Sequence, residues 1–274
     1  MAAFADLHIH TYYSDSTSSP EEVVADALKA QLACIAITDH DIIEGVVPTM
    51  EAARPHGLEV IPGIELSSDI EGKDVHILGY LMDIHQGPLM EKCHIFLEAR
   101  VARMKQMIVN LKGIGVNNIE FEEVCALTKS RAVGRAHLAV LLLQKGWVGS
   151  MKDAFEKYIG EGRPGYAPKF KQTPFEAIDL IHQSGGLAVM AHPMLTQKDE
   201  LIARLAKAGL DGLEVYYPNC SDTVTAFYEG LAKKHGLLLT GGSDAHGKAK
   251  NYTYVGKSSV PYDLVEKMKQ VLAV

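Results

Sequence analysis

The sequence predicts an α/β protein, a distorted TIM-like (β/α)7 barrel that carries an inserted small helical domain. Short apolar segments alternate with segments of helical period at both ends of the chain, a pattern typical of βαβ units. Acidic residues and histidines follow many of the apolar segments, and reactive groups gather at the carboxyl ends of barrel strands. A central stretch, residues 88–165, has helical patterns without a convincing strand.

The first part of the barrel is predicted from residues 1–87. The Ser-Pro-Glu-Glu sequence at residues 19–22 has a cap residue, a proline at the first helical position and a glutamate that completes a capping box. A helix therefore begins there and ends near residue 31. The remaining elements are strands at residues 6–10, 33–38, 58–66 and 75–81 and a helix at residues 44–56.

The central stretch predicts a helical insertion at residues 88–165. A long helical pattern covers residues 89–111, and a turn-rich sequence at residues 160–165 ends the insertion. Shorter helical patterns lie at residues 120–127, 134–145 and 150–159. We expect this domain to cap the site, so that the barrel domain comprises residues 1–87 and 166–274.

Alternation of strands and helices resumes after the insertion. A second capping box, Thr-Pro-Phe-Glu at residues 173–176, begins a helix that ends near residue 184. The remaining elements are strands at residues 187–191, 212–216 and 237–240 and helices at residues 199–208, 221–235 and 261–272. With the first part, this gives about seven repeats of strand and helix, as a TIM-like barrel requires.

Composition excludes several classes of protein. The chain has 274 residues, 47% hydrophobic and 22% charged, which is ordinary for a globular protein. Its net charge of −7 argues against binding of long nucleic acid but is compatible with a mononucleotide. We see no membrane-length apolar run and no signal peptide, so we expect a cytoplasmic protein without a membrane partner. The four cysteines form no Cys-x-x-Cys pair and are expected to be reduced thiols.

The first strand carries half of a metal site. His8 and His10 face one side of the strand, while Leu7 and Ile9 face the other. Two polar residues on the wet face of an edge strand are the alternative interpretation. The rest of the chain favours a metal site, because it supplies more donors at the ends of apolar segments. The full set is His8, His10, Asp15, Asp39, His40, Glu65, His76, His192, Glu214, Asp244 and His246.

This donor set indicates a chemistry. Imidazole and carboxylate without thiolate suit manganese, iron or zinc. A carboxylate such as Glu65 can bridge two cations through its two oxygens. Clustered cations activate water and clamp the oxygens of a phosphoryl group, so the pattern favours hydrolysis of a phosphate ester.

Four short motifs carry a resemblance to a known family. They are His8-Ile9-His10, Thr38-Asp39-His40, Ala191-His192-Pro193 and Ser243-Asp244-Ala245-His246, with Gly63-Ile64-Glu65 and His76 between the second and the third. The sequence resembles the PHP (polymerase and histidinol phosphatase) family, which has these motifs in this order. The resemblance implies the PHP fold and two or three divalent transition-metal ions, with Mn²⁺ first and Fe²⁺ or Zn²⁺ as alternatives.

The resemblance also implies the ligands of a trinuclear centre. The first ion would be held by His8, His10, Glu65 and Asp244, the second by Glu65, His76 and His192, and the third by Asp15, His40 and His246. Ser16 stands where the family often has glycine, so a centre of two ions is the alternative.

Five further residues are candidates for supporting parts. Asp39 and Glu214 are expected to orient metal ligands, with a cap or turn role and a plain salt bridge as their respective alternatives. Arg135, His137 and Lys169 are candidate substrate contacts, because a phosphate dianion needs donors outside the metal ligands and arginine supplies bidentate ones. The alternative for these three is that they are only solvated.

The insertion, with Gly134-Arg135 and Gly165-Tyr166, is similar to the PHP branch that removes phosphate from nucleotides. Members of that branch act on nucleoside 3′,5′-bisphosphates, on AMP or on the ends of short oligoribonucleotides, so we expect a small phosphate ester or a short oligonucleotide as partner. The resemblance implies a metal-bridging hydroxide as nucleophile, with His192 or a metal-bound water protonating the leaving oxygen. The alternatives are a histidinol phosphate phosphatase and a non-catalytic module stabilised by metal.

Overall fold

The chain folds into two compact units. The computed structural model describes residues 3–128, 130, 132–250 and 253–273. The first unit comprises Met1–Cys93 and Lys171–Val274, and the second comprises His94–Phe170. The insertion expected at residues 88–165 begins and ends a few residues earlier than this second unit, and its capping role stays a prediction. Among the described residues, no helix combines the length and the apolar character that crossing a bilayer requires.

One eight-stranded sheet forms the frame of the first unit, with strand order β7-β6-β5-β4-β3-β2-β1-β8. Most neighbours are parallel, as the alternation of strands and helices predicted. However, β4 is antiparallel to β3 and β5, and the short β8 is antiparallel to β1. The strands are β1 (Phe4–Ile9), β2 (Cys34–Ile37), β3 (Glu59–Ile70), β4 (Lys73–Tyr80), β5 (Leu187–Met190), β6 (Gly212–Tyr216), β7 (Leu238–Gly241) and β8 (Val260–Pro261).

The sheet closes on itself between β1 and the segment that follows β7. Ile9 and Ala245 form a parallel bridge, and the amide of His10 donates to the carbonyl of Ala245 at 3.0 Å. Gly242 permits this approach, because a Cβ atom on it would lie 2.3 Å from the backbone nitrogen of His8. Strands β1 to β7 therefore form a nearly closed barrel, and the predicted α/β barrel class is confirmed.

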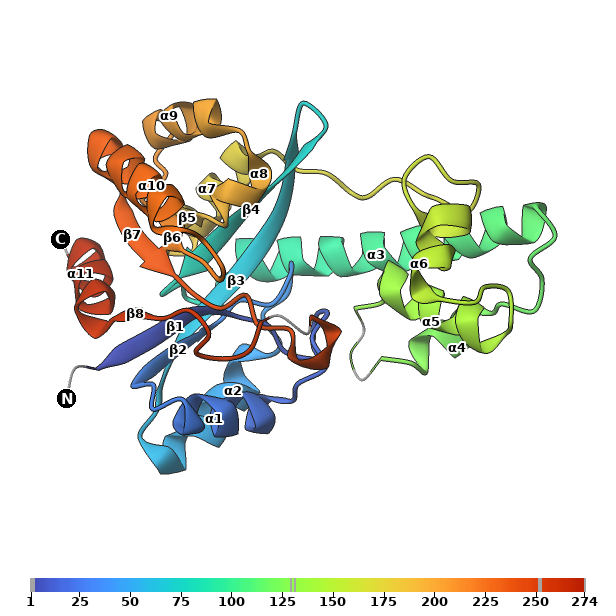
Figure 1. The fold of residues 1–274 in the computed structure, drawn as a ribbon, viewed down its shortest axis with the longest axis horizontal. Helices are drawn as coiled ribbons and strands as arrows, with labels where there is room; N and C mark the ends of the chain where they lie inside the picture. Colours follow the sequence, from blue (N-terminus) through green and yellow to red (C-terminus); the bar gives the residue numbers. More distant parts are fainter. Residues whose placement is uncertain (1–2, 129, 131, 251–252, 274) are drawn as a thin grey trace. The chain divides into compact units, whose positions relative to one another are not determined.

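Helices of the first unit lie on the outer side of the barrel strands (Figure 1). At α1 (Pro20–Lys29), the predicted capping box forms: the Glu22 amide donates to the Ser19 side chain, and the Ser19 amide donates to Glu22 Oε2 at 2.8 Å. The second predicted capping box begins α7 (Pro174–Gln183). The other helices are α2 (Val46–Ala53), η1 (Arg54–His56), α8 (Pro193–Thr196), α9 (Asp199–Lys207), α10 (Asp222–His235), η3 (Gly247–Ala249) and α11 (Tyr262–Leu272).

The side chains of β1 contribute to two different hydrophobic clusters. Leu7 is buried in the cluster that contains Tyr80, whereas Ile9 is buried in the cluster that contains Val23 of α1. The prediction that Leu7 and Ile9 share one layer is therefore wrong. The register between β1 and β2 shifts between Asp6 and Ile9, and such an irregularity interrupts simple alternation of side chains.

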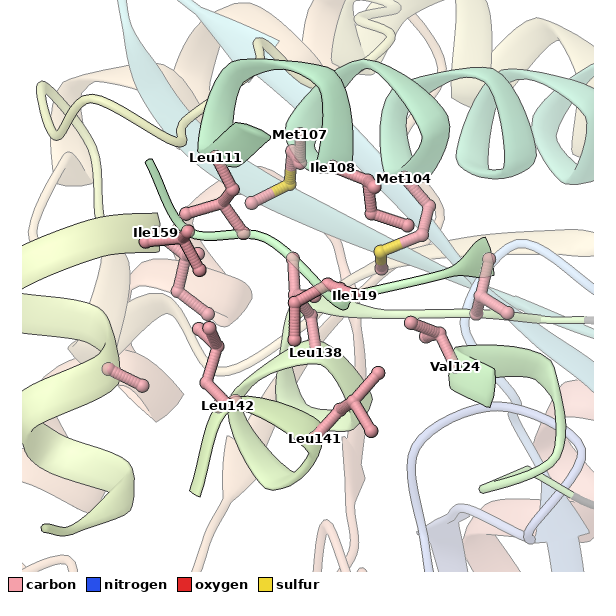
Figure 2. Close-up of a cluster of buried hydrophobic side chains, with 14 of the residues drawn as sticks. Met104, Met107, Ile108, Leu111, Ile119, Val124, Leu138, Leu141, Leu142 and Ile159 are labelled. Atoms are coloured by element: carbon pink, nitrogen blue, oxygen red, sulfur yellow. The ribbon is translucent and has the colours of Figure 1, made fainter. Parts of the chain in front are cut away.

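The second unit consists of helices joined by loops, with no strand among its described residues, and it has its own core. Met104, Ile108 and Leu111 on α3 face Leu138 and Leu142 on α5 (Figure 2). Their spacing places them on one side of each helix. The elements are α3 (Gly87–Gly113), which begins in the first unit, α4 (Phe121–Cys125), α5 (Arg135–Gln144), α6 (Met151–Ala154) and the π-helical η2 (Phe155–Ile159).

Candidate metal centre

The donors named for the trinuclear centre come from one end of the barrel. They are His8 on β1, His10 and Asp15 after it, His40 after β2, Glu65 on β3, His76 on β4, His192 after β5, and Asp244 and His246 after β7. His76 lies near the start of its strand and pairs with Ser67. Because β4 is antiparallel to its neighbours, its start lies at the same end of the barrel as the carboxyl ends of the parallel strands.

Glu65 lies in the middle of this cluster and is fully buried. Its Oε1 lies 2.7 Å from Nδ1 of His76 and 3.0 Å from Nε2 of His192. Its Oε2 lies 3.2 Å from a ring nitrogen of each of three more histidines, His8, His10 and His40. The two oxygens of one carboxylate thus face different imidazoles, which is the arrangement that a bridging ligand needs.

Three groups of side chains place their donor atoms within 4.8 Å of one another and could each hold an ion. The groups are His8, His10, Glu65 and Asp244; His40, Glu65 and His76; and His10, Asp15, His40 and His246. The first group has the same members as the set implied for the first ion. The second group has His40 in place of the expected His192, which belongs to none of the three groups although its Nε2 lies 3.0 Å from Glu65. The third group contains the expected Asp15, His40 and His246 with His10 in addition.

His8 and His10 are arranged around a common point. Their Nε2 atoms lie 3.1 Å apart, and Oδ1 of Asp244 lies 3.6 Å and 3.2 Å from them, respectively. All three residues are buried. Two imidazole nitrogens and two carboxylate oxygens that converge in this way form a donor set suited to a divalent transition metal.

Glu214 holds two of the histidines in place. Its Oε1 lies 2.8 Å from Nδ1 of His8, and its Oε2 accepts from the backbone amide of His192 at 2.7 Å. Because a carboxylate only accepts, Nδ1 of His8 donates to Glu214, and Nε2 faces the cluster. This contact is of the kind that orients a metal ligand.

Asp39 contacts the loop after β1 rather than an imidazole ring. Its Oδ1 accepts from the Thr11 amide at 2.8 Å and from the Ser14 hydroxyl at 2.5 Å, and its Oδ2 accepts from the Thr11 hydroxyl at 2.6 Å. Burial raises the pKa of Asp39 to about 6, although these hydrogen bonds oppose the shift. Asp39 therefore fixes the loop that carries Asp15.

Two residues of the cluster have a backbone conformation that side chains rarely adopt. The φ angle is +28° at His192 and +49° at Asp244. Residues other than glycine pay a conformational penalty there, and such strain is concentrated at functional sites. Both residues follow a barrel strand directly or within a short turn, so the strained backbone aims their side chains into the cluster.

The pKa values of the histidines in the cluster depend on their burial and on the neighbouring carboxylates. Burial alone would lower the pKa of His10, but the carboxylates of Asp244 and Glu65 outweigh it and raise the pKa to about 9. His40 differs, since burial lowers its pKa to about 3 and keeps it in the neutral form that binds metals.

The residues present fit the metal ions that the donor set implies. Buried ring nitrogens such as Nδ1 of His10 and Nδ1 of His192 have no hydrogen-bond partner within the described part of the chain. A buried polar atom without a partner is unfavourable, and a cation would remove that penalty at a nitrogen that faces it. The centre therefore satisfies the donor type, the burial and the spacing expected of a site for more than one ion.

Sequence reasoning missed two residues beside the cluster. Oδ2 of Asp244 accepts from the hydroxyl of Tyr217 at 2.8 Å and from Nζ of Lys250 at 2.9 Å. The signal for Lys250 in the sequence is that it closely follows the Ser243–His246 motif. This signal is weak, because a lysine in a loop is usually solvated. Tyr217 follows β6 in the same way that the metal donors follow other strands.

The candidate substrate contacts belong to the second unit, which is described by itself. Arg135 is the first residue of α5, with its guanidinium carbon 5.6 Å from the centre of the Phe155 ring. Nδ1 of His137 accepts from the Gly134 amide at 3.1 Å and so caps this helix. Lys169 is half-buried near the end of the unit.

Comparison with known proteins identifies the family. The PHP domain matches residues 6–271 of the chain. The chain belongs to the PHP family. The resemblance seen in the four motifs is thus confirmed, and so is the expectation of a phosphoric ester hydrolase.

Other PHP proteins resemble this one over most of their length. The 5′-3′ exoribonuclease Rnm of Escherichia coli strain K12 is 35% identical over 89% of this chain and 86% of its own. The 3′,5′-nucleoside bisphosphate phosphatase of Chromobacterium violaceum is 30% identical over 92% of this chain and 90% of its own. A solved structure from Bifidobacterium adolescentis, assigned as a metal-dependent phosphoesterase, has a TM-score of 0.85, 31% identity, and coverage of 96% of this chain and 94% of that one.

Proposed function

We propose that this PHP enzyme hydrolyses phosphate monoesters of nucleotides, with nucleoside 3′,5′-bisphosphates, AMP or the ends of short oligoribonucleotides as the substrate. The observation that carries the proposal is the position of Glu65, whose two oxygens face five histidines. The names of the exoribonuclease and the bisphosphate phosphatase described above support nucleotides as the substrate class.

We propose that nine residues of the first unit hold two or three divalent ions, with manganese first. Eight of them belong to the three groups described above, namely His8, His10, Asp15, His40, Glu65, His76, Asp244 and His246. The ninth is His192, whose Nε2 lies 3.0 Å from Oε1 of Glu65. Ions bound there would activate water for attack on phosphorus and withdraw charge from the phosphoryl oxygens. The chain itself orients the ligands, with Glu214 fixing His8 and the backbone of His192, and Asp39 fixing the loop of Asp15.

His192 is the candidate for moving the proton to the leaving oxygen. Its side chain keeps a 12% exposed fraction, in contrast to the fully buried His8. A proton donor must reach the substrate while remaining fixed in direction, and the Glu214 contact supplies the fixation. If His192 is only a metal ligand, a metal-bound water takes this part.

Arg135, with His137 and Lys169, is proposed to contact the nucleotide outside the metal ions. Burial and, next, the positive charge of Arg135 lower the pKa of Arg103 on α3. An anion bound near Arg135 would be attracted by both positive charges. A nucleotide with a second phosphate supplies such an anion.

A substrate panel tests the proposed function. The chain is reconstituted with Mn²⁺, and release of phosphate is compared for 3′,5′-bisphosphoadenosine, AMP, a 5′-phosphorylated trinucleotide and histidinol phosphate. We expect at least tenfold higher kcat/KM for one of the nucleotides than for histidinol phosphate. Fast turnover of histidinol phosphate alone would contradict the proposal.

A pair of variants ties the reaction to the centre. Glu65→Gln removes the carboxylate between the histidines, and the expected loss of rate is more than a hundredfold, because bridging charge is lost. Glu71→Gln, in the exposed turn of the same β3–β4 hairpin, is the matched control and should keep the wild-type rate and metal content. Equal rates for the two variants would place the reaction elsewhere.

A further inference from the structure

Lys250 lies at the edge of the metal cluster. Its Nζ donates to Oδ2 of Asp244 at 2.9 Å, and the hydroxyl of Tyr217 donates to the same oxygen at 2.8 Å. The other oxygen of Asp244 faces His10 at 3.2 Å. One carboxylate therefore has the metal cluster on one side and a cation with a phenol on the other.

The segment that carries Lys250 is held from several directions. The Lys248 amide donates to the Thr17 hydroxyl at 2.7 Å, which joins this segment to the loop of Asp15. The Thr253 hydroxyl donates to the Asp244 carbonyl at 3.1 Å. Lys250 thus starts from a fixed backbone, and its side chain, with a 31% exposed fraction, reaches from the solvent side to the buried Asp244.

The ammonium group of Lys250 has N–H donors that the hydrogen bond to Asp244 does not use. A lysine ammonium offers three N–H bonds, and the hydrogen bond to Asp244 uses one of them. A ligand that approaches from the solvent side can accept from the others without breaking this contact. Lys250 can therefore bind a second acceptor while Asp244 still directs it.

Charge balance argues that this second acceptor is an anion. The carboxyl groups in or beside the cluster belong to Asp15, Glu65, Glu214 and Asp244. Two divalent ions would already balance four carboxylates, so Lys250 is not needed for neutralisation once ions are bound. A lysine beside such ions is unfavourable on its own and becomes favourable when a phosphate dianion binds as well.

We propose that Lys250 is a substrate-binding residue that donates a hydrogen bond to a non-bridging oxygen of the phosphate group, with Asp244 and Tyr217 positioning it. The inference rests on the proposed function, since it concerns the same ester. It adds a phosphate contact within the first unit, independent of Arg135. The loop lysine and the metal centre would then act on one phosphoryl group from two sides.

The test uses full-length protein loaded with Mn²⁺ in four forms: wild type, Lys250→Ala, Lys250→Arg and Lys248→Ala. Bound manganese is measured by elemental analysis, binding of inorganic phosphate by calorimetry, and kcat and KM with an aryl phosphate. Lys248 is exposed on the same segment, so its variant controls for the general loss of one positive charge.

The expected result for Lys250→Ala is unchanged manganese content with phosphate binding and kcat/KM each weakened about tenfold or more, as for loss of a charge-assisted hydrogen bond. Lys250→Arg should recover part of the loss, and Lys248→Ala should match wild type. Unchanged phosphate affinity in Lys250→Ala would overturn the inference, as would loss of manganese from that variant. Phosphate binding reports on Lys250 even if wild type hydrolyses no ester, so failure of the proposed function is distinguishable.

Discussion

Gly45 packs directly against the carboxylate of Asp39. A Cβ atom at residue 45 would lie 2.2 Å from Oδ2 of Asp39 and 2.6 Å from the hydroxyl of Thr11. The φ angle of Gly45 is −76°, so any residue could adopt its backbone conformation. The glycine is required by the space that Asp39 and Thr11 occupy, and it links the start of α2 to the loop that carries Asp15.

The Gly45→Ala variant should therefore lose metal. The methyl group has to displace Asp39 or Thr11, which releases the Asp15 loop and weakens binding of the ion nearest to it. We expect a destabilisation of about 1–3 kcal/mol and a reduced number of bound ions by elemental analysis. Gly230→Ala, in α10 where a Cβ atom meets nothing within 4 Å, is the control and should gain about 0.5–1 kcal/mol. Full metal occupancy in Gly45→Ala would show that Asp39 does not control the loop.

Replacing Glu214 by Gln tests its orienting role. The amide group is similar in size, but it presents a donor where the carboxylate accepts from both His8 and the amide of His192. Metal affinity is expected to fall about 10- to 100-fold, read from titration with Mn²⁺. Glu229→Gln, which alters a contact to the Tyr216 hydroxyl away from the centre, should leave the affinity unchanged. Equal affinities in the two variants would reduce Glu214 to an ordinary ion-pairing residue.

Chelation should lower the thermal stability of the wild-type protein. A ligand that binds only the folded state stabilises it by about 2.7 kcal/mol at a concentration of 100 times Kd. Removing Mn²⁺ is therefore expected to lower Tm, and adding it back should restore Tm. The Glu65→Gln variant should respond far less, since it lacks the carboxylate between the histidines. If chelator does not change the Tm of the wild-type protein, that result would argue against tight metal binding.

Arg135→Ala should lower the catalytic efficiency of the enzyme without changing its metal content. We expect kcat/KM for a nucleotide to fall about tenfold or more, because the variant would lack the proposed charge-assisted contact to phosphate. Lys152→Ala, on α6 of the same unit and with an 81% exposed side chain, is the control for charge. An unaltered kcat/KM in Arg135→Ala would remove this residue from the substrate site.

The core of the second unit predicts a stability difference between two leucines of the same helix. Leu138 is fully buried in the cluster of Figure 2, whereas Leu143 is 38% exposed. Leu138→Ala should destabilise the protein by about 2–5 kcal/mol, and Leu143→Ala should stay within about 0.5 kcal/mol of wild type. Urea denaturation measures both, and similar losses would mean that α5 packs differently.

The sequence predicted the elements of the barrel because local signals agree with the final structure. The capping boxes at Ser19 and Thr173 both form as expected, and the strand ends carry the polar residues of the cluster. The direction of β4 was not predictable in this way, since an apolar strand has the same pattern whether it runs parallel or antiparallel. Its direction explains why His76, in the first half of β4, faces donors that follow the parallel strands.

Contacts between distant residues were predicted less completely. Glu214 was expected beside a metal ligand, but the structure shows that it contacts both His8 and His192. Asp39 was expected to orient a metal ligand, and its hydrogen bonds go to Thr11 and Ser14 of the loop that carries Asp15; pairings over such long sequence separations leave no local pattern. Lys250 lies only six residues after its partner Asp244 and was missed because a lysine in a loop is usually solvated. The sequence shows which residues can donate to a metal ion. The hydrogen-bond partner of each carboxylate oxygen depends on how the strands are arranged in the closed barrel.

The positive φ angles of His192 and Asp244 lower the stability of the folded protein, although the side chains of these two residues belong to the candidate metal centre. Glycine would suit both backbones better than the residues that stand there. A His192→Gly protein should therefore unfold at a higher temperature than His192→Ala, although both lack the imidazole. The difference in Tm between these two variants would measure how much stability the protein loses by having a residue other than glycine at this position.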